Sequence, residues 1–199
     1  MAHALVAKWE GDDTAHRLGR ITLNPIPHLD LMGSVLVPLA LYLLPGNFLF
    51  GWAKPVPVNP RNYRNPKWGD IRVSLAGIAA NLILALLCTL LLGILVKVGV
   101  LLGSTSGPIL LLQEMVSFGI LINLVLAVFN LIPLPPLDGS HVAYHLLPPH
   151  LGARYQELGR YGIGILMLVV FVFPEAFTLL FWPVEILLSA AEFFVGLWI

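Results

Sequence analysis

The chain has 199 residues, of which 58% are hydrophobic and 11% are charged, whereas soluble domains carry about a quarter charged residues. This composition excludes an ordinary soluble domain and predicts a polytopic membrane protein, which we expect to be all-α. The 11 basic and 11 acidic residues balance, so we expect no nucleic-acid partner, and the single cysteine excludes Cys-based metal sites.

The N-terminal residues 1–9 are typical of a helix that is already under way at residue 1, because no capping residue precedes them. His3 matches the second His of a helical His-Glu-x-x-His motif, in which two imidazoles four residues apart bind zinc and the Glu is the general base. The first His and the Glu would precede Met1, so we expect an N-terminally truncated chain. On His3 alone, an ordinary N-terminal histidine remains the alternative.

The apolar stretch 29–52 is interrupted by Gly33, Pro38, Pro45 and Gly46, and its longest clean piece is short for a membrane span. Basic residues cluster on both sides of it, and the positive-inside rule places such clusters on one face of the membrane. We therefore predict a re-entrant hairpin here rather than a crossing.

Short extended segments are predicted next, over residues 54–58. Prolines at 55 and 57 remove the backbone donors on one edge of a strand, while Val56 and Val58 keep theirs on the other edge. Such an edge could hold an extended peptide substrate by strand addition. A structural strand closed by the protein's own hairpin is the alternative.

Two long uncharged runs, 73–96 and 115–137, predict membrane helices. The first reaches about 36 Å at about 1.5 Å per residue, enough to cross a core of about 30 Å. The second meets prolines at 133, 135 and 136 and should end near Ile132. We also predict a membrane helix over 161–174, and residues 176–199 fit either a final span or an interfacial helix.

Asp138 follows the proline run, in an irregular turn at or near membrane depth. An ionisable residue there is costly and suggests a functional role, although Asp is also common in interfacial turns. Asn130, eight residues earlier, could donate a hydrogen bond to an oxyanion, or it could cap its own helix. His141 and His145 share a helical face, which we interpret as an amphipathic interface rather than a second metal pair.

Several segments together resemble the short bacterial and archaeal branch of the site-2 protease family, peptidase family M50, over nearly the whole chain. They are His3 with Ala2 and Ala4, and the segments 11–15, 19–25, 28–30, 51–60 and 130–139. The Gly-Pro-x-x-Asn of that family occurs as Gly77-Ile78-Ala79-Ala80-Asn81, without the proline. The resemblance implies a site-2-protease-like helical core, forming one membrane-embedded domain over 1–199.

The resemblance also implies a catalytic Zn²⁺ held by two His residues and an Asp, which map onto His3 and Asp138 and leave the first His unmatched. The implied function is intramembrane zinc metalloendopeptidase, acting on membrane-protein or peptide substrates in the bilayer, in the plasma membrane of a prokaryote. Without the Glu, residues 1–199 are expected to be inactive. The alternatives are a non-catalytic membrane scaffold and a small transporter that uses Asp138 in an ion path.

Overall fold

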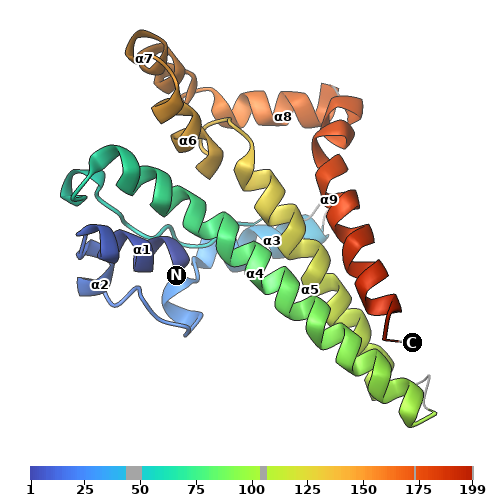
Figure 1. Ribbon diagram of the computed structural model, residues 1–199. Coiled ribbons are helices and arrows are strands. Elements are labelled where there is room, and N and C mark those ends of the chain that lie inside the picture. The colour runs from blue at the N-terminus through green and yellow to red at the C-terminus, as the bar shows by residue number, and fades with distance from the viewer. Residues whose placement is uncertain (44–50, 104–106, 173, 199) are drawn as a thin grey trace. The chain divides into compact units, whose positions relative to one another are not determined.

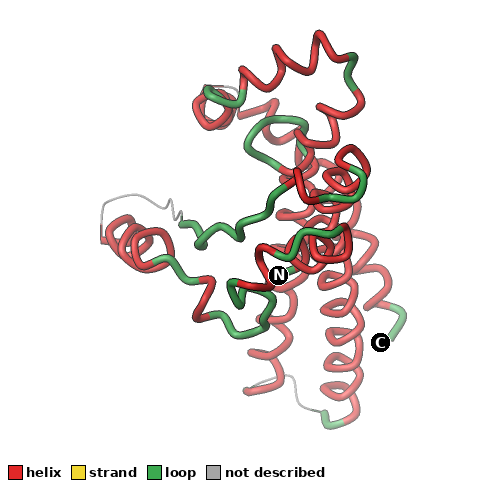
Figure 2. Tube along the Cα trace, turned by 90° about the vertical axis from the view of Figure 1, so that its left-hand side faces the viewer, coloured by secondary structure: helices red, strands yellow, loops and turns green. Residues whose placement is uncertain are grey.

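The computed structural model describes residues 1–43, 51–103, 107–172 and 174–198 and divides the chain into two compact units, Met1–Val73 and Ser74–Ile199. Their boundary falls inside helix α4 (Figure 1). Within the described residues every regular element is helical and no strand occurs, so the all-α prediction is confirmed there (Figure 2). That residues 1–199 form a single domain stays a prediction.

The first unit holds short helices and the start of a long one. They are α1 (Ala2–Glu10), α2 (Thr14–Arg17), the 3₁₀ turn η1 (Ile26–His28), the π-helical turn η2 (Leu31–Leu36), α3 (Val37–Leu43), the 3₁₀ turn η3 (Pro60–Asn62) and the first residues of α4 (Pro66–Leu101). The second unit holds the rest of α4, then α5 (Pro108–Leu131), α6 (Asp138–Leu146), α7 (Pro149–Leu158), α8 (Gly162–Val172) and α9 (Pro174–Gly196).

Three described helices are long and apolar enough to cross a membrane: Pro66–Leu101, Pro108–Leu131 and Leu179–Gly196. The first contains the predicted span 73–96, the second covers the predicted helix from 115 to within one residue of its expected end, and the third favours a span over an interfacial helix for the C-terminal region. Most of their large apolar side chains are exposed, as expected where lipid tails are the solvent. The membrane helix predicted over 161–174 is observed as α8, whose 11 residues reach only about 16 Å and cannot cross alone.

The core of the second unit lies where α4, α5 and α9 pack together. Ala85 of α4, Ile120 and Leu124 of α5 and Val184 of α9 are each at most 5% exposed. The three helices run side by side in Figure 1. Small residues allow this approach: a Cβ added to Gly119 would lie 3.1 Å from the Cys88 sulfur, which is tighter than an ordinary contact.

In the first unit, residues 52–54 lie beside residues 28–33, at the start of η2. The Trp52 and Lys54 N–H groups donate to the Gly33 and His28 carbonyls at 3.0 and 2.9 Å. A side chain at Gly33 would collide with the Trp52 ring, so the return path requires glycine there. This return agrees with the predicted hairpin, whose residues 44–50 lie outside the described residues, and its entry into the membrane stays a prediction.

Candidate metal and peptide site

His3 lies on α1, which packs closely because its buried face is made of alanines. Ala4 and Ala7 are fully buried, and Ala7 packs with Tyr63 and with Val73 of α4. A small side chain at these positions lets the backbone of α1 approach α4. His3 is half-buried, and its Nδ1 lies 2.8 Å from the carbonyl oxygen of Val73.

This hydrogen bond determines which ring nitrogen of His3 carries a proton. A carbonyl oxygen can only accept, so Nδ1 must be the donor. In the neutral imidazole, Nε2 then carries the lone pair, which is the form that binds a metal ion. Metal-binding histidines usually donate their other N–H to a carboxylate or a backbone carbonyl. The Val73 contact therefore gives His3 the arrangement expected of a zinc ligand.

Asp138 is the first residue of α6, so the prediction that it lies in an irregular turn is wrong; the turn occupies residues 132–137, directly before it. Helix α5 ends at Leu131, with Ile132 as its C-cap, so the predicted end of this helix is confirmed. The peptide bond between Pro135 and Pro136 is cis. The half-buried Asp138 occupies the first turn of α6, where the helix dipole favours a carboxylate.

Gly139 explains how Asp138 comes to lie against the end of α5. A Cβ at Gly139 would lie 2.5 Å from the carbonyl carbon of Leu131 and 2.7 Å from the Ile132 oxygen, with the Leu131 oxygen closer still. Only glycine lets the two backbones approach this closely. Gly162, at the start of α8, has the same role, since its Cβ would overlap the Pro135 oxygen.

Asn130 is bonded within its own helix. Its Nδ2 donates to the carbonyl of Leu126, one turn earlier, at 2.9 Å. This is the local bond that the sequence offered as an alternative to catalysis, and it uses one of the two amide hydrogens. Its predicted contact with an oxyanion or substrate stays a prediction.

Residues 51–59 form an irregular segment rather than the predicted strand, because no second strand pairs with it among the described residues (Figure 2). Some N–H groups of this segment are bonded within the chain, and the substrate-binding edge at Val56 and Val58 stays a prediction. Trp52 and Lys54 donate to the segment 28–33, as the hairpin alternative required. Further along, no acceptor among the described residues bonds the N–H groups of Val56 and Val58. Val58 is 37% exposed and Val56 is half-buried.

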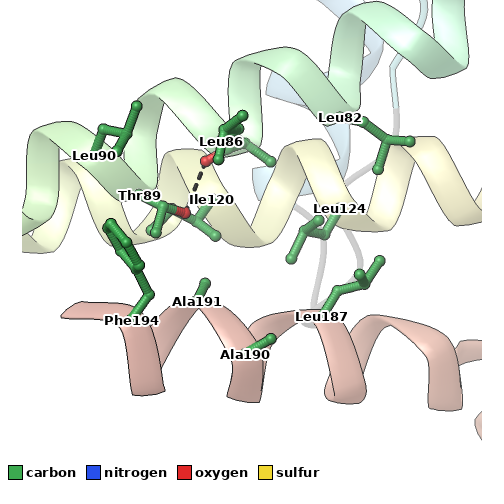
Figure 3. Close-up of a pocket in the computed structure, with 11 residues that line it drawn as sticks. Leu82, Leu86, Thr89, Leu90, Ile120, Leu124, Leu187, Ala190, Ala191 and Phe194 are labelled. Carbon is green, nitrogen blue, oxygen red and sulfur yellow. Dashed lines mark hydrogen bonds between the residues drawn. The ribbon is translucent and has the colours of Figure 1, made fainter. Parts of the chain in front are cut away.

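His3 lies in the first unit and Asp138 in the second, and their pairing as zinc ligands stays a prediction. Within the described parts of the chain, no three His, Cys, Asp or Glu side chains form a group that could hold a metal. A hollow of about 360 Å³ between α4, α5 and α9 is lined by apolar side chains (Figure 3). Its one hydroxyl, on Thr89, donates to the Ala85 carbonyl at 2.9 Å, so this hollow carries no hydrolytic chemistry.

Comparison with known proteins gives the family. The model of peptidase family M50 matches residues 1–171. The chain belongs to peptidase family M50, the site-2 protease family. It is 43% identical over 185 residues to "Putative zinc metalloprotease YwhC" of Bacillus subtilis, covering 92% of this chain and 78% of that protein.

Two further relatives carry similar names. "Putative zinc metalloprotease Rip2" of Mycolicibacterium smegmatis is 30% identical over 195 residues, or 90% of this chain and 66% of the relative. "Putative zinc metalloprotease NMA0084" of Neisseria meningitidis is 36% identical over 66 residues, or 31% of this chain and 15% of the relative. No solved structure matches the chain.

Two features of this region were not predicted from the sequence. The first is the Val73 carbonyl, which holds the His3 ring. Every residue has a backbone carbonyl, so the sequence does not show which one His3 contacts. Asp12 was seen only as part of a family-like segment, yet its side chain is fully buried. Its place directly after Gly11, at the end of a helix, was the one available signal.

Proposed function

We propose that this protein is an intramembrane zinc metalloendopeptidase of family M50 that hydrolyses peptide bonds in or near transmembrane segments of membrane proteins. The three candidate spans and the bacterial relatives support a place in the plasma membrane of a prokaryote. The lipid bilayer and an extended peptide are then its partners.

The observation that carries this proposal is the hydrogen bond from His3 Nδ1 to the Val73 oxygen. It holds the ring in one orientation with Nδ1 as the donor, which is the tautomer whose Nε2 can bind zinc. We assign the carboxylate ligand to Asp138, which lies in the first turn of α6. When bound, zinc polarises the scissile carbonyl and lowers the pKa of water.

The remaining residues would bind the substrate. Val56 and Val58 offer backbone donors to a peptide added alongside residues 56–58, because these N–H groups have no acceptor among the described residues. The second amide hydrogen of Asn130 could donate to the developing oxyanion. No residue of 1–199 matches the family's general-base Glu, so we expect residues 1–199 alone not to hydrolyse peptides.

Zinc content tests the ligand assignment. The protein translated from the full reading frame should bind zinc in detergent micelles, and His3→Ala and Asp138→Ala should each weaken binding at least 10-fold. His16→Ala is the matched control, because the His16 side chain is exposed and pairs with Asp13 at 3.5 Å, and neither residue is a proposed zinc ligand. Unchanged zinc in either ligand variant would refute the assignment. A folded protein that takes up no zinc would instead support the non-catalytic scaffold.

A further inference from the structure

The carboxylate of Asp12 has no exposed surface, and the hydrogen bonds that it accepts from the described residues come from two segments. Its own loop contributes the N–H of Thr14 at 3.2 Å and the Thr14 hydroxyl. The distant segment contributes the Asn59 N–H at 2.7 Å to Oδ2 and the Asn62 Nδ2 at 2.9 Å to Oδ1. A buried carboxylate with this many donors is held in one orientation.

The other side of Asp12 is joined to α1. Its backbone N–H donates to the Ala7 carbonyl at 2.8 Å, closing the last turn of the helix that carries His3. Gly11 makes this closure possible because it adopts a φ of 113°, a backbone conformation that residues other than glycine rarely adopt. A continuous path of hydrogen bonds therefore leads from α1 through Asp12 to Asn59.

A second hydrogen bond from the region near α2 holds the same segment. Arg20 is 8% exposed, and its Nη2 donates to the Pro55 carbonyl at 3.2 Å. Pro55 and Asn59 are thus held by residues that follow α1 and α2, whereas the N–H groups of Val56 and Val58 have no acceptor among the described residues.

We propose that Asp12 is a positioning residue: it fixes the open edge at Val56 and Val58 relative to helix α1, and so relative to His3. This inference rests on the proposed function, because Asp12 would position the bound peptide relative to the zinc ion. A misplacement of about 1 Å can cost about 100-fold in rate. Loss of the Asp12 contacts should therefore impair peptide binding and alignment without removing a zinc ligand.

The test compares Asp12→Asn with Asp13→Asn in the zinc-loaded protein from the full reading frame. Asp13 is the matched control, since it is the next residue and carries the same charge, and its side chain forms exposed ion pairs with His16 and Arg17. Asp12→Asn should lower kcat/KM by about 10- to 100-fold, mainly through KM, at unchanged zinc content. Asp13→Asn should stay within about twofold.

Two further measurements separate positioning from general destabilisation. Hydrogen exchange over residues 52–59 should accelerate in Asp12→Asn but not in Asp13→Asn. The double variant Asp12→Asn with Asn62→Asp exchanges the amide and the carboxylate of the hydrogen-bonded pair Asp12–Asn62. It should recover part of the loss in kcat/KM. Unchanged exchange at 52–59, or a fall in activity that only follows the folded fraction, would overturn the role of Asp12. An unchanged zinc affinity of His3→Ala would instead refute the proposed function. Hydrogen exchange over residues 52–59 would still test whether Asp12 holds that segment in place.

Discussion

Replacing Gly139 by alanine gives a sharp test of how Asp138 is positioned. The new Cβ would lie 2.5 Å from the Leu131 carbonyl carbon and 2.7 Å from the Ile132 oxygen. Favourable contacts between carbon atoms lie at about 3.5–4.0 Å, so α6 must move away from the end of α5. The colliding atoms are backbone atoms, which cannot rotate aside as a side chain could.

The expected cost is at the upper end of the range for an overpacked site, about 3 kcal/mol. The total stability of a protein is about 5–15 kcal/mol, so this loss is easily measured. Gly164→Ala is the control, because nothing lies within 4 Å of its Cβ and alanine favours a helix by up to about 1 kcal/mol.

Equilibrium unfolding of both variants in detergent micelles is the assay. Gly139→Ala should unfold at a clearly lower denaturant concentration than the parent protein, and Gly164→Ala at an equal or higher one. Zinc affinity should fall with Gly139→Ala, because Asp138 moves together with its neighbour. If Gly139→Ala were as stable as Gly164→Ala, the close approach of α6 to α5 would be refuted.

Three further outcomes concern the first unit. Burial, and then the negative charges of Asp70, Asp12 and Glu10, raise the pKa of Tyr63 to about 12, so stability should fall as pH rises from about 10 to about 12. The Tyr63 hydroxyl has no hydrogen-bond partner among the described residues. Tyr63→Phe should therefore abolish the fall in stability at high pH without lowering stability at neutral pH. A clear loss of stability at pH 7 would contradict this expectation. Burial alone would raise the pKa of Asp12, but its hydrogen bonds lower it below the usual value, so the parent should lose stability below about pH 4 and Asp12→Asn should lose less. Arg72→Gln breaks a 2.8 Å ion pair with Glu10 whose arginine is 61% exposed, and thermal unfolding should report less than about 1 kcal/mol; a larger loss would mean that the pair is less solvated than its exposure indicates.

The long helices could be predicted because their signals are local. The uncharged run after Arg72 is long enough to cross a bilayer, and the prolines from Pro133 end α5 by removing backbone donors. Membership of the family was likewise visible in the short motifs around His3 and Asp138. Each of these signals lies within a few residues of the feature that it predicts.

The strand expected over 54–58 was the weaker prediction, because a strand needs a partner and its own sequence does not say where that partner is. The structure gives Trp52 and Lys54 acceptors in the segment 28–33, and among the described residues the N–H groups of Val56 and Val58 have none. The prediction for α8 was incomplete for a different reason. Its apolar composition indicated a membrane helix, but composition does not give the length of the helix, and 11 residues are too few to cross a bilayer.

The sequence by itself determined the membrane class, the long helices and the residue types of a zinc site, since composition and proline placement act over a few residues. Only the tertiary structure decided which nitrogen of His3 is protonated and why Asp12 is buried. Those answers depend on Val73, 70 residues from His3, and on Asn59, 47 residues from Asp12. A hydrogen bond between groups so far apart in the chain exists only once packing has brought them together, because a buried polar group must then find its partner within about 3 Å.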